Sequence, residues 1–141
     1  MKKSGFTLIE LILVVSLVLI IATMTTPFAG SFLLRTYHDT ATSHVISAIH
    51  RAQSLAMDGK GGTGWGICLN GQTLRVYQGT CNAPTLKEDS TIPATISVTG
   101  LSDTTFTRTT GTSSNTLNIT ISSSIKTTSI TTNEMGVLSV N

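Results

Sequence analysis

One acidic side chain, Glu10, lies inside the long apolar run near the N-terminus. Residues 11–22 are apolar apart from one serine, and the next charged side chain is Arg35. A carboxylate in the apolar core of a membrane costs up to about 3 kcal/mol, and a residue kept there usually has a function. The chemistry open to Glu10 is to neutralise a cation at similar depth. Because its own helix supplies no such cation, we expect the partner to come from outside that helix.

Two cysteines, Cys68 and Cys81, form the other pair of reactive side chains. They offer either a disulfide or half of a metal site, and the sequence holds no second pair of cysteines to complete a metal site. Outside the cytoplasm such a pair favours a disulfide. The closed loop of about 14 residues would stabilise the fold by roughly 3 kcal/mol.

Three histidines, His38, His44 and His50, are spaced six residues apart. On a helix each is rotated by about 240° from the one before, so they do not converge on one metal ion. We interpret them as solvated or interfacial side chains. No Ser/His/Asp grouping stands out either, so the sequence predicts no catalytic residue, no cofactor and no metal, and an enzyme with a small-molecule substrate is not expected.

The glycine-rich stretch 59–66 is similar to a phosphate-binding loop in composition only. A Walker loop places its lysine after the last glycine and leads from a strand into a helix. Here Lys60 precedes most of the glycines, and the stretch follows a predicted helix. We therefore interpret it as a flexible connection rather than a nucleotide site.

The composition limits the classes of protein that the chain can belong to. It has 141 residues, enough for one domain with an appendage, and only 11% of them are charged. Nine basic against seven acidic side chains give a net charge of +2, too little to indicate a nucleic-acid binder. Charge-driven disorder, collagen and a dense disulfide scaffold are also excluded.

An apolar helix over residues 6–30 is long enough to span a bilayer, which needs about 20 residues. Lys2 and Lys3 precede it, which favours a cytoplasmic N-terminus and places the residues after Arg35 on the outer side. A conventional signal peptide fits poorly. Glu10 interrupts its apolar region, and the best late cleavage site, before Gly30, would leave Pro27 three residues upstream of the cut.

The stretch Gly5-Phe6-Thr7-Leu8-Ile9-Glu10, behind a short basic leader, resembles the class III signal of type IV pilins and type II secretion pseudopilins. The resemblance implies that a prepilin peptidase cuts between Gly5 and Phe6 and methylates the new N-terminus. It also assigns assembly to Glu10, which meets the Phe6 amine of a neighbour, and a helix kink to Pro27. The implied partners are prepilin peptidase, other pilin or pseudopilin subunits, the inner membrane and its assembly platform.

The helical pattern continues from residue 31 to residue 58, and Gly59 is a good stop signal. An apolar stripe recurs at spacings of three and four and predicts the face that packs on a sheet. Its members are Tyr37, Ala41, Val45, Ala48, Ala52 and Leu55. Ile46 lies off this stripe, and we expect it to face a neighbouring subunit.

Short strands rich in threonine follow the glycine-rich stretch. A hairpin is predicted over residues 65–69 and 73–77 with Asn70-Gly71 as its turn, and 133–136 predicts a last hairpin turn. Further strands are expected at 95–99, 105–108, 116–122, 125–132 and 137–140.

The expected fold is α+β, a long N-terminal helix packed on a small antiparallel β-sheet domain, as in type IV pilins. The helix has a transmembrane half and an amphipathic half. We divide the chain into a leader at 1–5, a membrane and filament-core helix at 6–30, the amphipathic half of the helix at 31–58 and a globular β domain at 59–141.

A second resemblance, to the GspH/FimT family of minor pseudopilins and minor pilins, covers most of the chain. It rests on the helix end, with Arg51, Ala52 and Ala56, on the cysteine-containing strand and glycine-rich hairpin that follow, and on the short hairpin that closes the chain. The implied function is a structural subunit of a type II secretion pseudopilus or a type IV pilus. The implied location is the inner membrane, with the β domain periplasmic, and then a periplasmic pseudopilus or an extracellular pilus.

The alternative function is a pilus-displayed subunit that binds DNA or a surface. DNA-binding members of the family carry an arginine-rich C-terminal tail, whereas residues 136–141 contain no arginine. Removal of Lys2 and Lys3 leaves seven basic and seven acidic side chains, so the mature chain lacks the charge that dominates DNA affinity. Arg75, Arg108 and Lys126 remain the basic residues that a DNA site would need to gather.

Overall fold

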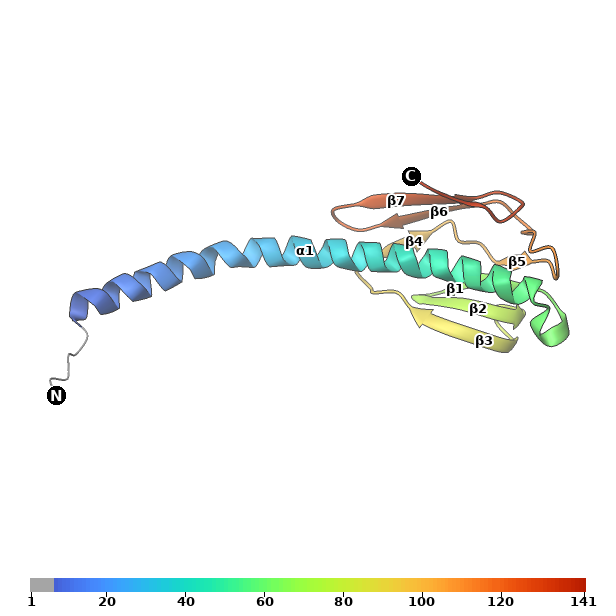
Figure 1. Ribbon diagram of the computed structural model, residues 1–141, viewed down its shortest axis with the longest axis horizontal. Helices are drawn as coiled ribbons and strands as arrows, with labels where there is room; N and C mark the ends of the chain where they lie inside the picture. The colour runs from blue at the N-terminus through green and yellow to red at the C-terminus, as the bar shows by residue number, and fades with distance from the viewer. Residues whose placement is uncertain (1–6) are drawn as a thin grey trace. The chain divides into compact units, whose positions relative to one another are not determined.

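The computed structural model describes the backbone of residues 7–141 and the side chains of those residues except 24–29. Contacts divide the chain into two units, Met1–Leu33 and Leu34–Asn141. One helix, α1 (Leu8–Met57), contributes to both units, and all the strands belong to the second (Figure 1). We call the second unit, Leu34–Asn141, the head.

The head joins the C-terminal half of α1 to two antiparallel sheets. A short 3-10 helix, η1 (Lys60–Gly62), leads into the strands, which are β1 (Trp65–Asn70), β2 (Thr73–Gly79), β3 (Pro84–Thr91), β4 (Ser97–Thr99), β5 (Thr104–Phe106), β6 (Leu117–Ser122), β7 (Thr127–Thr132) and β8 (Leu138–Val140). The strand orders are β3-β2-β1-β5 in the first sheet and β4-β6-β7-β8 in the second. The prediction of an α+β fold, a helix packed on antiparallel sheets as in pilins, is confirmed (Figure 1).

The buried face of α1 differs in part from the predicted stripe. The residues of α1 that the head buries are His38, Ala41, Val45, Ile49, Ala52, Leu55 and Ala56. Tyr37 is 37% exposed and Ala48 is only half-buried, whereas His38 and Ile49 are fully buried and take the places expected for them. Ile46 is half-buried and packs against the core of its own chain, and its contact with a neighbouring subunit stays a prediction. The helix contacts two sheets, and this widens its buried face beyond a single stripe.

A single hydrophobic core joins α1 to both sheets. The first sheet contributes Trp65, Ile67, Leu74, Val76 and Phe106, and the second contributes Leu117, Ile119, Ile121 and Ile130. The alternation expected for β6 is present, because Leu117, Ile119 and Ile121 are buried while Asn118 is exposed. The sheets and α1 therefore depend on one another for burial of their apolar faces.

The first hairpin forms as predicted, but its turn is shifted by one residue. Asn70 pairs with Thr73, so the two connecting residues are Gly71 and Gln72 rather than Asn70 and Gly71. Gly71 has a φ of 62°, a conformation that glycine adopts without steric cost. The last turn lies where the sequence predicts it, with the Asn133 amide bonded to the Val137 carbonyl at 3.2 Å.

Strand β3 was not predicted from the sequence. Among the described strands it pairs with β2 alone. Its residues are almost all exposed, and its sequence has no apolar alternation. Pro84 begins the strand, a position where its missing N–H costs nothing, and Lys87, Glu88 and Asp89 give the edge a charged character. Such a strand is defined by its partner rather than by its own pattern.

Candidate functional site

The start of α1 is closed by reciprocal hydrogen bonds between Thr7 and Glu10. The Thr7 amide and the Thr7 hydroxyl both donate to Oε2 of Glu10, at 2.9 Å and 2.7 Å. The Glu10 amide donates to Oγ1 of Thr7 at 3.4 Å. This arrangement is a capping box, which satisfies two backbone amides that have no partner within the helix.

The residues assigned to processing and to the helix kink, unlike Glu10, are not among the residues whose side chains the structure describes. Gly5 and Phe6 precede the described residues, and Pro27 falls within the helix bounds but its side chain is outside the described set. Their roles in cleavage and in bending the helix stay predictions. Glu10 is therefore the one member of this group whose contacts are known.

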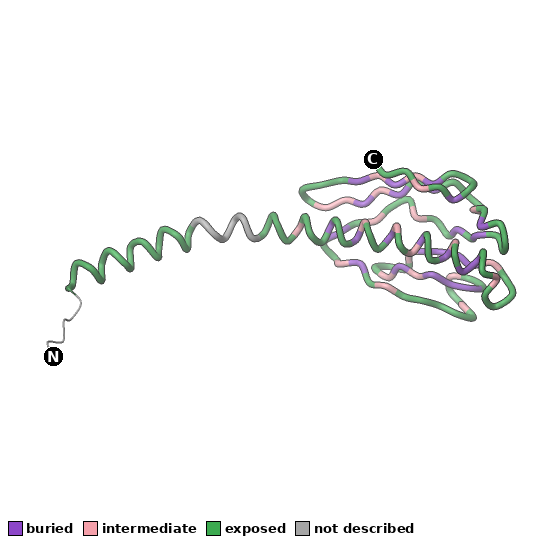
Figure 2. The backbone as a smooth tube through the Cα atoms, viewed as in Figure 1, coloured by how far each residue is buried: buried purple, intermediate pink, exposed green. Residues whose placement is uncertain are grey.

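The first unit presents large apolar side chains on every side of α1. From Leu8 to Ile21 these side chains are 51–78% exposed in the single chain (Figure 2). A helix that is apolar all round is stable only where apolar surroundings cover it. Within the described residues, no helix has the length and mean hydropathy needed to cross a membrane.

A disulfide joins Cys68 of β1 to Cys81 in the β2–β3 connection, the pairing that the sequence favours. Arg75 of β2, which is paired with Cys68 in the strand register, also binds this connection. Its Nη1 donates to the Cys81 carbonyl at 2.8 Å. The guanidinium also binds both carboxylate oxygens of Asp89 on β3, at 2.8 Å and 3.1 Å. The disulfide, Arg75 and Asp89 thus tie three parts of the first sheet together.

The ion pair between Arg75 and Asp89 should make part of the head's stability sensitive to acid. The Arg75 hydrogen bond, with help from Lys87, lowers the pKa of Asp89 from 3.8 to about 2. Because the pKa of Asp89 is lower in the folded state than in the unfolded state, its ionised pair with Arg75 stabilises the folded state above pH 4. That contribution is lost as the pH falls through 2. We expect Asp89→Asn to flatten the dependence of the unfolding free energy on pH between 4 and 2, as measured by urea denaturation.

The matched control for that experiment is Asp39→Asn. Asp39 pairs with Lys126, but both side chains are more exposed, 62% and 49%, than those of Asp89 and Arg75, 30% and 13%. Solvent screens an exposed pair, so the control should change the pH profile less. Equal profiles for the two variants would contradict the importance given to Arg75 and Asp89.

Side chains of α1 fasten the helix to the first sheet through its edge strand. Arg51 makes two bonds to the Glu88 carboxylate, at 3.1 Å and 2.9 Å. About two turns earlier on the helix, Nδ1 of His44 lies 3.0 Å from the Ser90 hydroxyl. These residues line a groove of about 470 Å³ together with Leu74 and Val76.

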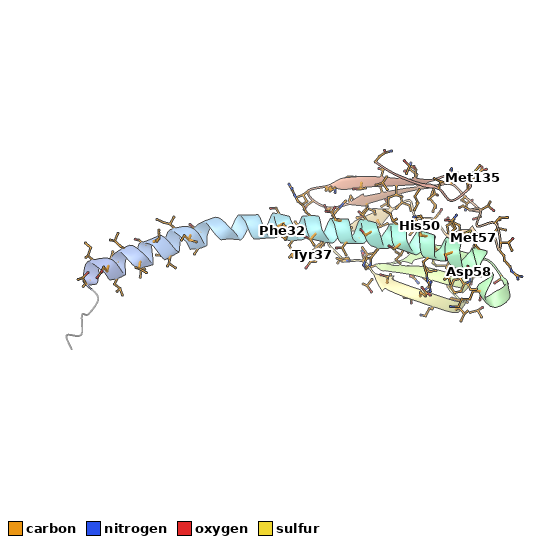
Figure 3. All side chains as sticks on the ribbon, in the orientation of Figure 1. Phe32, Tyr37, His50, Met57, Asp58 and Met135 are labelled. Carbon is orange, nitrogen blue, oxygen red and sulfur yellow. A yellow bond between two sulfur atoms is a disulfide. The ribbon has the colours of Figure 1, made fainter. Side chains whose placement is uncertain are left out.

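A second set of side chains fastens α1 to the connections that precede or join the strands β6, β7 and β8. Lys126, in the β6–β7 turn, binds Asp39 at 2.8 Å. Near the end of the helix, Nε2 of Gln53 lies 3.2 Å from both the Gly111 and Met135 carbonyls. The exposed side chains of His50 and Met57 lie on this part of α1, and Asp58 directly follows its last residue (Figure 3).

The interpretation of all three histidines as solvated or interfacial was wrong for one of them. His38 is fully buried, and its Nε2 lies 3.2 Å from the Ile121 carbonyl on β6. His44 and His50 are exposed, as expected. Among the residues that the structure describes, no cluster of histidine, cysteine or acidic side chains has the arrangement of a metal site.

The glycine-rich stretch connects the helix to the first strand and is held by bonds to its backbone. The Lys60 carbonyl accepts from the Trp65 indole at 2.9 Å and from the Gln78 amide at 3.1 Å. Gly61 has a φ of 76°, and a Cβ there would clash with the Gln78 side chain. The stretch thus leads from a helix into a strand, opposite to the direction of a Walker loop.

The three basic residues needed for a DNA site have separate partners. Arg75 binds Asp89, Lys126 binds Asp39, and Arg108 donates to the Gly62 carbonyl at 3.3 Å. Two of the three charges are therefore neutralised by a carboxylate. This arrangement gives no support to phosphate binding.

The outward face of the second sheet also carries no charge at its described positions. Strand register aligns three rows, Ser97-Ser122-Thr127, Thr99-Thr120-Ser129 and Asn118-Thr131-Ser139. Hydroxyl and amide groups keep such a face soluble, which explains how threonine can dominate the strands without charge.

Comparison with known proteins supports the class indicated by the helix and the site. Residues 1–26 match the family model for the prokaryotic N-terminal methylation motif. No curated protein and no solved structure matches the chain. The motif supports a type IV pilin-like protein, the precursor of a pilin or pseudopilin. It implies processing by prepilin peptidase and assembly with other pilins, and it suggests a membrane-anchored structural subunit rather than an enzyme.

Thr7 is the residue of this site that sequence reasoning missed. The signal was present, because Thr7-Leu8-Ile9-Glu10 has the Thr-x-x-Glu spacing of a capping box directly before an apolar run. Asp89 was also missed, since its role depends on a strand pairing that no local pattern reveals.

Proposed function

We propose that the protein is a minor pseudopilin or minor pilin, a structural subunit of a type II secretion pseudopilus or a type IV pilus. The observation that carries the proposal is Glu10, a carboxylate at the start of a helix that is apolar all round, within the methylation motif. In this proposal the precursor is cut after Gly5, and the new N-terminal Phe6 is methylated.

Charge neutralisation explains why the apolar helix keeps a carboxylate. Cleavage creates a cationic amine at Phe6, and in a bundle of such helices this amine meets the Glu10 carboxylate of a neighbour. Each charge alone in an apolar medium would cost several kcal/mol, and pairing the two charges offsets part of that cost. The exposed apolar side chains from Leu8 to Ile21 supply the remaining contact surface between subunits.

The proposed location follows from the charges that flank the helix. Lys2 and Lys3 stay in the cytoplasm, residues 6–30 cross the inner membrane, and the head lies in the periplasm. The subunit then moves into a periplasmic pseudopilus or an extracellular pilus. The leader, residues 1–5, is lost on the way.

Within this class we propose membership of the GspH/FimT family. The support is the Arg51-Ala52 helix end, the Cys68–Cys81 pair directly after the helix, and the short glycine-containing hairpin that closes the chain. A disulfide in this place differs from the C-terminal disulfide usual in major pilins.

Intact-mass measurement of the protein purified from membranes tests the proposal. We expect a chain that begins at Phe6 and carries one additional methyl group. An uncut chain, or a chain that begins at Gly30, would rule out processing as a pilin.

A second experiment tests the assembly role of Glu10. We expect Glu10→Ala to remain inserted in the membrane and to be nearly absent from sheared filaments, because the neighbour's amine loses its counter-charge. The matched control is Glu134→Ala, which removes an exposed carboxylate from the head. Normal incorporation of Glu10→Ala would refute the role of this carboxylate.

A further inference from the structure

The last strand of the second sheet, β8, leaves one of its edges open. Among the described strands its one neighbour is β7. Ser129 and Asn141 exchange both of their backbone hydrogen bonds, each at 2.9 Å. Bonded and non-bonded positions alternate in an antiparallel pair, so Ser139 is the next bonded position along β8. The backbone N–H and C=O groups of Leu138 and Val140 therefore point away from β7.

These groups offer two donors and two acceptors to a further strand. By the same alternation β7 bonds none of them, and no turn or loop bond in the described part of the chain reaches them. The Leu138 side chain packs partly against the core, whereas Val140 is 50% exposed. A row of unpaired edge groups is a template for another strand, because each new backbone bond satisfies a donor and an acceptor.

The chemistry around β8 differs from that of β3, the outer strand of the first sheet. Residues 84–91 of β3 include one proline and three charged side chains, which discourage another strand from pairing there. Residues 135–141, which we call the β8 edge, contain neither charge nor proline. Instead, Met135, Val137 and Val140 are 73%, 61% and 50% exposed. The β8 edge therefore suits a strand that is itself uncharged.

We propose that the β8 edge docks, by strand addition, an extended and uncharged segment of a different subunit in the same filament. The identity of the occupant as a filament subunit rests on the proposed function, whereas the open edge does not. Backbone bonds supply the affinity. Val137 and Val140, on opposite faces of the strand, select uncharged side chains, because a charge laid over them would lose water without gaining a partner.

A second copy of this chain, pairing through its own β8, is the alternative occupant. Antiparallel pairing of two β8 strands needs a two-fold axis perpendicular to the sheet. That axis would reverse the direction of the head's part of α1 in the second copy, because this part of the helix packs on the face of the sheets. Subunits related by helical repetition all point the same way. The proposed function therefore favours a different subunit.

One substitution can remove a donor from the β8 edge without breaking the pairing of β8 with β7. Val140→Pro removes the outward N–H, and an edge strand tolerates proline where that N–H faces away from its neighbour. Val140→Ala is the matched control, because it also loses the valine side chain but keeps the N–H. Thermal unfolding of the full-length protein in detergent micelles should agree for the two variants, since the Val140 amide makes no bond to β7.

The probe for the edge is a capped synthetic peptide of residues 127–132, the uncharged sequence of β7, which pairs with the other side of β8. In amide NMR of the full-length, isotope-labelled protein in micelles, millimolar peptide should shift Leu138 and Val140 saturably. Val140→Pro should weaken binding about fivefold, the factor for one typical hydrogen bond, and Val140→Ala by less than about twofold. A capped peptide of residues 84–91, from charged β3, should not bind.

Three results in micelles would overturn the inference. If the peptide of residues 127–132 leaves Leu138 and Val140 unshifted, the edge accepts no strand. If the charged peptide binds equally well, or if Val140→Pro binds as tightly as Val140→Ala, the open uncharged edge is not what binds. If sedimentation shows a dimer of the full-length protein that Val140→Pro abolishes, the occupant is a second copy.

Incorporation into sheared filaments tests the occupant separately. We expect Val140→Pro to be inserted and cut like the wild type but incorporated about fivefold less, whereas Val140→Ala is incorporated normally. Peptide binding combined with normal incorporation of Val140→Pro would show that the occupant is not a filament subunit. Absence of the wild-type protein from filaments would refute the proposed function and this occupant with it, while the peptide result would still decide whether the edge accepts a strand.

Discussion

Replacing both Cys68 and Cys81 with alanine is expected to lower the unfolding free energy of the head by about 3 kcal/mol. The disulfide closes a loop with a sequence separation of 13, and its loss increases the conformational entropy of the unfolded chain. For a unit of this size the melting temperature should fall by roughly 10–20 °C. Circular dichroism of the full-length protein in detergent micelles measures this change.

Reduction of the wild-type protein provides the control for the disulfide prediction. Wild-type protein treated with a thiol reductant should melt near the temperature of the double alanine variant, whereas the variant should not respond to the reductant. Arg75 should still bind Asp89 in the variant, because that ion pair does not involve the sulfur atoms. If the unfolding free energy of the double alanine variant falls by less than about 1 kcal/mol, the prediction is contradicted, and Arg75 is sufficient to hold the β2–β3 connection.

Truncation of Ile49 is the second substitution expected to have a large effect. Ile49 is fully buried in the core that α1 shares with both sheets, so Ile49→Ala should cost about 2–5 kcal/mol of unfolding free energy. The adjacent residue, His50, is exposed, and His50→Ala should change stability by less than about 0.5 kcal/mol. Urea denaturation of the two variants compares neighbouring positions on the same helix.

The manner of unfolding adds a second measurement to this comparison. Because one core joins α1 to both sheets, fluorescence of Trp65 and far-UV circular dichroism should report a single coincident transition in the Ile49→Ala variant. Similar losses for Ile49→Ala and His50→Ala would contradict the buried face of α1 described above.

Local patterns were sufficient for the N-terminal region and for most of the strands. The stretch from Gly5 to Glu10 and the apolar run after it indicate a pilin-like precursor without any knowledge of tertiary contacts. The alternation in residues 117–122 likewise identifies β6, since a strand with one buried face records that burial in its own sequence.

Features that depend on a partner distant in sequence could not be predicted. β3 has no apolar alternation and exists as a strand because β2 pairs with it. The burial of His38 requires the Ile121 carbonyl, which is 83 residues away. The preference for Ile49 over Ala48 on the buried face of α1 depends on how the two sheets contact the helix.

The sequence by itself indicates a pilin-like precursor, because the methylation motif and the apolar run that follows it are contiguous in the chain. Only the tertiary structure decided which side chains fasten the helix to the sheets. It also decided that residues 84–91 form the edge strand β3 beside β2. Those features depend on the rotation of α1 and the register of the strands, and these are set by packing of the whole core at once. The capping box of Thr7 and Glu10 is local too, and the sequence carries its spacing, but the structure shows that its bonds form.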